Sequence, residues 1–202
     1  MSDKPRGYFS KLLVMDCETS GLAFKHYDPS IEPDGSGEYQ AVSWGLAVVD
    51  STDFKVIDTL YVEIKYNGIA IWSDGAERVH KMSREYLEEN GLTEEDAAVE
   101  IGEFILKHFG TNTVRCAGHN VATFDIWFMR RLLNQFDIMF ETGNRFVDTN
   151  SIGYACYESY TSDQLFELMG VERGTHNAME DVMACVKVLK NTRHIYNTVL
   201  GD

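Results

Sequence analysis

The stretch KLLVMDCETSGL, residues 11–22, limits what this chain can fold into more than any other part of it. Four consecutive apolar residues, 12–15, are typical of a β-strand covered on both faces, so we expect a central sheet with helices on both sides. Asp16 and Glu18 follow at once. Because successive side chains of a strand point to opposite faces, these two carboxylates share one face and Cys17 lies on the other.

Two carboxylates on one face of a strand need a chemical reason. Like charges this close repel and raise each other's pKa unless a cation lies between them. Since Mg²⁺ and Mn²⁺ prefer hard oxygen ligands, a divalent metal site is one interpretation. The alternative is that the strand ends at Met15 and that both acids lie in a solvated turn opened by Thr19, Ser20 and Gly21.

The rest of the chain alternates between strand and helix patterns. Residues 23–40 contain prolines and glycines without an apolar period, which predicts a long loop. Further strands are predicted at 41–50, 56–66, 114–117 and 145–148, the first two forming an antiparallel meander with the opening strand. Helices are predicted at 83–90, 93–108, 123–136 and 178–200. This order indicates an α/β fold with a mixed central β-sheet flanked by helices, and a ligand site where the first strand ends.

Composition narrows the classes of protein that remain. A length of 202 residues with 44% hydrophobic residues fits one domain over residues 1–202 and excludes a disordered chain. The formal charge of −14 argues against broad tracking of duplex phosphates, but not against a nucleic acid end held locally by metal ions. The four cysteines contain no CxxC pair, so we interpret them as reduced core residues. No span or signal peptide is recognisable, which predicts a cytoplasmic protein without a membrane partner.

A second acid follows a short strand in the stretch CAGHNVATFDIWFMRR, residues 116–131. Asp125 lies in the first turns of the predicted helix, where the helix dipole favours an acid whether or not the acid has a catalytic role. Phe124 and Phe128 lie on one apolar stripe and fit the core better than a platform for nucleobases.

The third acidic stretch is GTHNAMEDVMACVKVL, residues 174–189. Asn177 is a good N-cap with Glu180 three residues later, so the helix should start at Ala178 and place Asp181 in its first turn. His176 then lies just outside the helix, where it can lean over Asp181 or remain an ordinary exposed loop residue.

Together the three stretches resemble the motifs of the DEDD 3′→5′ exonucleases, in the branch with a histidine in the third motif. DCETSGL is similar to D-x-E-T-x-G-L, GHNVATFD to the second motif, and HNAMED to H-x-x-x-x-D, and the similarity runs from residue 12 to about residue 195. VHKMS, residues 79–83, is similar to the V-H-G-I-S of polymerase proofreading subunits, and VDT, residues 147–149, to a strand after the second motif. Three departures stand out: one extra residue before Asp125, a spacing similar to that of oligoribonucleases; a loop insertion at 23–40, longer than the typical connection after the first motif; and Lys81 where a glycine is expected.

The resemblance implies a ribonuclease H-like fold and a hydrolase that uses two divalent metal ions, Mg²⁺ or Mn²⁺, roughly 3.5 to 4 Å apart. It implies that Asp16 bridges both ions, that Glu18 and Asp181 hold the one that activates water, and that Asp125 binds directly or through water. His176 is then the general base. The substrate contacts that it implies are Thr19, Gly21, Leu22, His80, Asn120 and Phe124.

The expected substrate is the 3′ end of a single-stranded nucleic acid, because a terminal base must be separated from its partner to enter such a site. DNA is favoured and RNA remains open, since no residue can be assigned to the 2′-hydroxyl. A polymerase or another replication protein is a possible partner. The rival interpretations are an inactive exonuclease-like binding module, and a metal-dependent phosphatase or endonuclease on the same fold.

Overall fold

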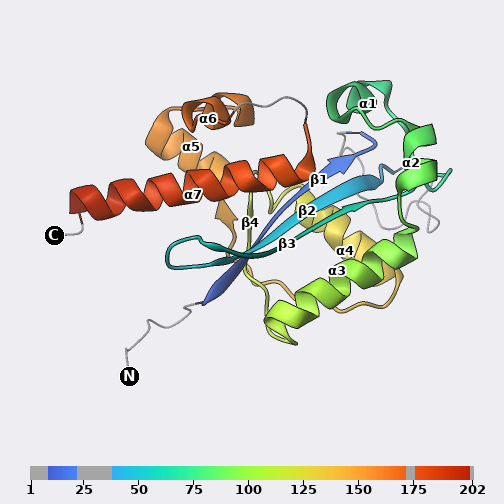
Figure 1. Ribbon diagram of the computed structural model, residues 1–202, viewed down its shortest axis with the longest axis horizontal. Coiled ribbons are helices and arrows are strands. Elements are labelled where there is room, and N and C mark those ends of the chain that lie inside the picture. The colour runs from blue at the N-terminus through green and yellow to red at the C-terminus, as the bar shows by residue number, and fades with distance from the viewer. Residues whose placement is uncertain (1–8, 22–37, 172–175, 201–202) are drawn as a thin grey trace.

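The computed structural model describes residues 9–21, 38–171 and 176–200. Five strands form one sheet in the order β3-β2-β1-β4-β5 (Figure 1). Their bounds are β1 Lys11–Thr19, β2 Ala41–Asp50, β3 Val56–Glu63, β4 Cys116–Gly118 and β5 Val147–Asp148. The first three strands pair antiparallel as a meander, and β4 and β5 add in parallel beside β1. The predicted α/β fold with a mixed sheet is therefore confirmed.

Strand β1 lies in the middle of the sheet and extends to Thr19, with Asp16 opposite Gly45 and Glu18 opposite Ser43. The alternative in which the strand ends at Met15 is therefore wrong. Both acids belong to the strand itself, next to a buried core, rather than to a solvated turn.

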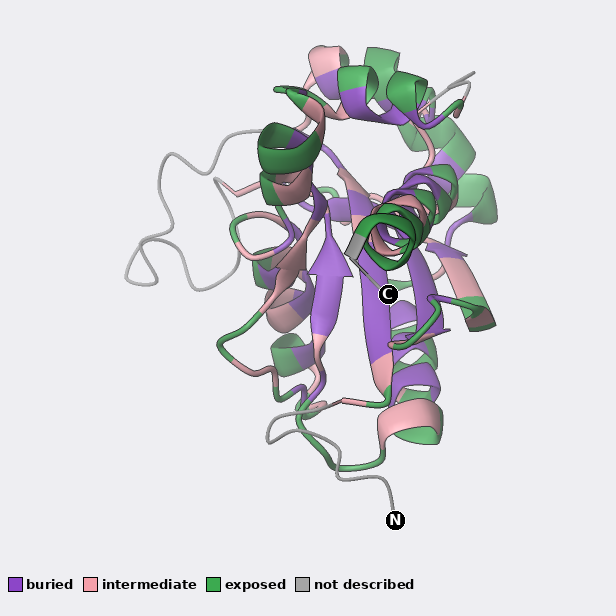
Figure 2. Cartoon of the chain, turned by 90° about the vertical axis from the view of Figure 1, so that its left-hand side faces the viewer, coloured by how far each residue is buried: buried purple, intermediate pink, exposed green. Residues whose placement is uncertain are grey.

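Helices cover both faces of the sheet, which explains why β1 is apolar on both sides (Figure 1). Leu13, Met15 and Cys17 pack in one cluster with α3 (Glu94–Phe109) and α4 (Asp125–Gln135). Leu12 and Val14 pack on the opposite face with α6 (Ser162–Leu168) and α7 (Ala178–Leu200). Figure 2 shows the buried strands between helices whose outer sides are exposed.

The remaining helices are α1 (Asp74–His80), α2 (Arg84–Asn90) and α5 (Thr149–Tyr157). The predicted caps are present: Ser83 accepts a hydrogen bond from the Tyr86 N–H and Thr93 from the Asp96 N–H. Sequence patterns did not predict α1, which is short, has a glycine at its second position and lacks a side-chain cap bond.

Cys17, Cys116 and Cys185 are buried and free, but Cys156 is exposed, so its assignment to the core was wrong. It lies in the last turn of α5, beside the exposed residues Tyr154 and Ala155. Of the predicted loop at 23–40, only residues 38–40 lie within the described part of the chain.

No helix among the described residues is long and apolar enough to cross a membrane.

Candidate active site

The site begins with the direction in which β1 presents its acids. Cross-strand partners share a face, so Asp16 points to the same side as Gly45, the side covered by α7. Glu18 lies two residues further on and shares that face. Both carboxylates therefore continue the row of Leu12 and Val14 and come out beside the start of α7, where both are half-buried.

The first turn of α7 rests directly on β2 at Gly45. A Cβ atom at this glycine would lie 2.4 Å from the Ala178 carbonyl oxygen and 2.6 Å from the Met179 nitrogen. Only a residue without a side chain allows this approach. The contact brings Asp181, in the same helical turn, onto the face that carries Asp16.

The helix start is fixed as the sequence predicted. The side-chain oxygen of Asn177 accepts hydrogen bonds from the N–H groups of Met179 at 3.0 Å and Glu180 at 3.3 Å, while the Asn177 amide donates to the Tyr61 hydroxyl at 3.3 Å. The side chain of Asn177 thus caps the N-terminus of α7 and also ties it to Tyr61 of β3. Asp181 is 6% exposed, whereas its neighbour Glu180 is exposed to solvent.

Asp16, Glu18 and Asp181, hereafter the acidic trio, each offer a carboxylate oxygen, and these oxygens lie within 4.8 Å of one another. Three hard oxygen ligands from two rigid elements fit a divalent cation such as Mg²⁺ or Mn²⁺. A cation there would also offset the repulsion among three negative charges that are partly withdrawn from water.

Asp125 adjoins the acidic trio without being part of it. It begins α4, is 1% exposed, and its Oδ1 accepts a hydrogen bond from the backbone N–H of Cys17 at 2.9 Å. Burial raises the pKa of Asp125 to about 7, against the lowering effect of that bond. Burial raises the pKa of the Cys185 thiol, and the negative charges of Asp16, Asp181 and Asp125 add to this effect.

The extra residue in the second motif is taken up by a turn. Asn120 adopts a left-handed conformation, with φ 58°, and its carbonyl accepts hydrogen bonds from the N–H groups of Thr123 and Phe124. The chain then enters α4 at Asp125. The side-chain oxygen of Asn120 is used locally, since it accepts a 2.7 Å hydrogen bond from Asn150.

The predicted base, His176, lies two residues before α7 and is half-buried, next to the capping Asn177. This is the predicted position outside the helix. Its catalytic role remains a prediction.

The predicted substrate contacts at the end of β1 form one short segment. Thr19 is buried, and its hydroxyl donates to the Gly21 carbonyl at 2.8 Å. Gly21 lies against the ring of Tyr39, because a Cβ atom there would be 1.9 Å from a ring carbon. Leu22 falls outside the described residues.

The other predicted contacts lie on neighbouring elements. His80 ends α1 and is 5% exposed; its Nδ1 accepts a hydrogen bond from the Met82 N–H at 3.1 Å, and burial lowers its pKa. Phe124 is partly buried against the core cluster that includes α4, with its ring 5.2 Å from that of Phe128. This packing agrees with the core interpretation, and its contact with substrate remains a prediction.

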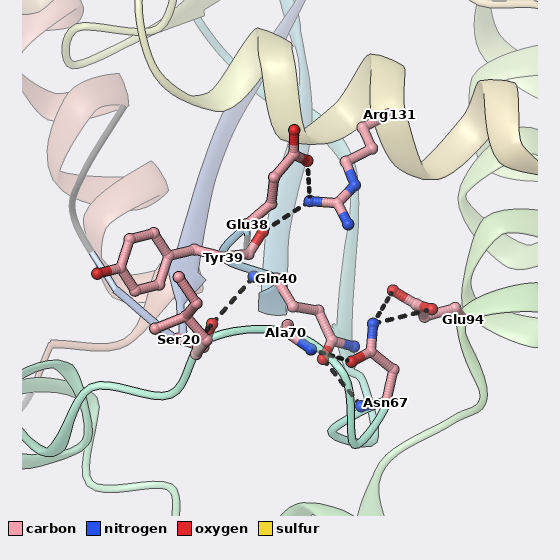
Figure 3. A network of polar contacts seen from close by, with 9 residues as sticks. Ser20, Glu38, Tyr39, Gln40, Asn67, Ala70, Glu94 and Arg131 are labelled. Carbon is pink, nitrogen blue, oxygen red and sulfur yellow. Dashed lines mark hydrogen bonds and ion pairs between the residues drawn. The ribbon is translucent and has the colours of Figure 1, made fainter. Parts of the chain in front are cut away.

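Sequence reasoning missed a polar network that holds the end of β1 (Figure 3). Ser20 and Gln40 are joined by two hydrogen bonds, from the Ser20 N–H to the Gln40 carbonyl at 2.8 Å and from the Gln40 N–H to Ser20 Oγ at 2.9 Å. Arg131 of α4 pairs with Glu38 at 2.6 Å and donates to the Tyr39 carbonyl at 2.9 Å. The network links α4 to the segment after Glu18. Its partners are far apart in the sequence, so no local pattern predicts it.

Comparison with known proteins gives the family. The sequence model of the RNase_T family, described as an exonuclease, matches residues 13–189. The chain belongs to this exonuclease family. The resemblance to the DEDD 3′→5′ exonucleases, and with it the assignment to a family of enzymes, is confirmed. No curated protein sequence matches the chain.

Solved structures of E. coli exonuclease I share the fold. The complex with a dT13 oligonucleotide is 18% identical with a TM-score of 0.71, covering 96% of this chain and 43% of that chain. The complex with a dA16 oligonucleotide is 19% identical with a TM-score of 0.70, covering 96% and 42%. The zinc-bound form of a complex with single-stranded DNA is 20% identical with a TM-score of 0.70, covering 95% and 41%. The chain has the predicted ribonuclease H-like fold and spans about two fifths of the length of these chains.

Proposed function

We propose that this exonuclease removes nucleoside 5′-monophosphates from the 3′ end of single-stranded nucleic acid, with DNA as the favoured substrate. The observation that carries the proposal is the acidic trio, in which residues far apart in the sequence place carboxylate oxygens within 4.8 Å of one another. The family match over residues 13–189 supports the reaction class.

The acidic trio would hold the divalent cations, which we propose to be two Mg²⁺ or Mn²⁺ ions. Bound ions supply Lewis-acid activation of water and neutralise charge on the phosphate. Asp16 is paired across the sheet with Gly45, on which the first turn of α7 rests, so it shares β1 with Glu18 and faces the turn that carries Asp181; this position suits a ligand shared by both ions. Asp125, held by the Cys17 N–H at 2.9 Å, completes the anionic side of the site directly or through water.

His176 is the proposed general base. The residue lies outside the helix, two positions before α7 and five before Asp181 in the sequence. An imidazole is the side chain that enzymes use most often as a general base, so it is suited to accept the proton of the attacking water.

The preference for single strands is supported by the related structures, which were determined with dT13 and dA16 oligonucleotides. A second candidate is an RNA-specific enzyme similar to oligoribonucleases, favoured by the extra residue between His119 and Asp125.

The test is product analysis with matched DNA and RNA oligomers of several lengths in Mg²⁺ or Mn²⁺. Stepwise release of mononucleotides from 5′-labelled DNA, blocked by a 3′-terminal modification, is the expected result. Asp16→Asn and Asp181→Asn should abolish release while the protein stays folded. Glu180→Gln is the matched control, because Glu180 is exposed in the same helical turn and should be dispensable. Cleavage of circular DNA, or full activity of Asp16→Asn, would contradict the proposal.

A further inference from the structure

A cavity of about 340 Å³ lies between α3 and the segment that follows α4. We call it the α3 groove. It is lined mainly by apolar side chains, with Ile105, Val114 and Phe140 buried at its base. At Gly102 a Cβ atom would lie 2.8 Å from Ile138, so this glycine lets the segment after α4 close against the helix.

The α3 groove is separate from the candidate active site. Val114 lies just before β4, which pairs in parallel with β1 through Cys116 and Leu13. Asp16 and Glu18 of the acidic trio come after the residues of β1 that pair with β4, so they lie toward the opposite end of these strands. They also lie on the face of the sheet covered by α7, whereas α3 covers the other face. Nothing in the proposed hydrolysis uses the groove.

Large apolar side chains line the rim of the α3 groove and remain in solvent. Leu106 is 59% exposed and Met139 72% exposed. Val99, seven residues before Leu106 and therefore on the same face of α3, is 46% exposed. Apolar side chains gathered around a cavity, rather than scattered singly, mark a surface that another molecule covers.

The charges around the α3 groove select among possible occupants. Its described lining includes two carboxylates, Glu103 and Glu141, and no lysine or arginine. These acids disfavour a nucleic acid and an anionic lipid. They also disfavour a symmetric dimer through this face, because each acid would meet a second copy of the same acidic rim.

We propose that the α3 groove binds a short amphipathic segment of a partner protein, with large apolar side chains flanked by lysine or arginine. The apolar side chains enter between Leu106 and Met139, and the basic residues face Glu103 and Glu141. When an amphipathic helix binds in a hydrophobic groove, apolar side chains spaced along one face of the helix make the main contacts. The rim charges set the preference for a basic partner.

The probe is a synthetic helical peptide of about 15 residues, with leucine at i, i+4 and i+7 and lysine at the outward positions. Its fluorescence anisotropy is measured with the full chain, and the Met139 methyl signal is followed by NMR. The double variant Leu106→Ser/Met139→Ser should weaken the dissociation constant by about tenfold or more, as expected for removal of central apolar contacts. Glu103→Gln/Glu141→Gln should weaken it less and reduce its dependence on salt.

The matched control is Ile195→Ser/Val199→Ser on α7, which removes exposed apolar side chains (50% and 70% exposed) from a surface without this cavity lining. It should leave binding unchanged. All four altered apolar positions are exposed, so the variants should remain folded. Three outcomes would overturn the proposal: no binding by the unaltered chain, equal weakening by the control variant, or a dimer that the groove variant dissociates. Activity plays no part in this test, so its result is independent of the proposed nuclease function.

Discussion

The close contact between the start of α7 and Gly45 of β2 predicts that Gly45→Ala disturbs the acidic trio. The new Cβ atom would lie 2.4 Å from the Ala178 carbonyl oxygen, 2.5 Å from its carbonyl carbon and 2.6 Å from the Met179 nitrogen. These are backbone atoms, so no side chain can rotate away. Ordinary contact begins near 3.4 Å, and the start of α7 must therefore retreat by about 1 Å.

Asp181 moves with that turn, while Asp16 and Glu18 stay on β1. A displacement of about 1 Å at a reacting centre can lower the rate about 100-fold, and disturbed support of metal ligands can lower metal affinity about 10- to 100-fold. The overpacking should also lower the free energy of unfolding by about 1 to 3 kcal/mol.

The assay is calorimetric titration with Mn²⁺ together with the rate of mononucleotide release, at a temperature where circular dichroism shows the variant folded. Gly143→Ala is the control, since its Cβ atom would be 3.6 Å from Thr113, an ordinary contact. If Gly45→Ala binds Mn²⁺ and cleaves within about twofold of the unaltered chain, the contact with Ala178 does not set the geometry of the acidic trio.

Three further predictions follow from single positions. Because burial raises the folded pKa of Asp125 to about 7, above its ordinary 3.8, metal-free protein should lose stability as the pH rises through that interval. Urea unfolding in EDTA should show this slope, and Asp125→Asn should reduce it. Gly21→Ala should displace the Tyr39 ring and slow nucleotide release, and Gly21→Ala/Tyr39→Ala should recover much of the rate. Lys81 has φ 63°, a conformation that favours glycine, so Lys81→Gly should raise the free energy of unfolding by about 0.5 to 1 kcal/mol in urea titrations.

Local patterns predicted what local physics controls. Helix starts at Ser83, Thr93 and Asn177 follow from side chains that satisfy N–H groups two or three residues away, and the sequence displays those pairs directly. The apolar stretch before Asp16 predicted a strand buried on both faces for the same reason.

Long-range contacts were not visible in the same way. The glycine in AVSWGLAVVD is a general sign of close backbone approach, but the sequence does not say that Ala178 is what approaches Gly45. The burial of Asp125, which shifts its pKa, depends on how α4 packs beside Cys17. The sequence placed the acids on the correct elements; packing decides which of them can share an ion.

The burial of Gln40, at the end of the predicted loop 23–40, could not be predicted from composition. The composition of the loop predicted an irregular segment, yet Gln40 is 3% exposed and bonded on several sides. Its side-chain amide donates to the Lys65 carbonyl at 2.8 Å and its side-chain oxygen accepts from the Asn67 N–H at 3.0 Å. Each of these partners is distant in sequence, so composition alone could not reveal that the end of the loop is part of the support for β1.

The most direct test of the account is anomalous diffraction from crystals of the exonuclease grown with Mn²⁺. We predict a manganese peak within coordination distance of the carboxylates of Asp16, Glu18 and Asp181, lost in Asp181→Asn and retained in Glu180→Gln. A saturated crystal with no peak at these three side chains, or with manganese bound only elsewhere, would contradict the central claim that they form one metal site.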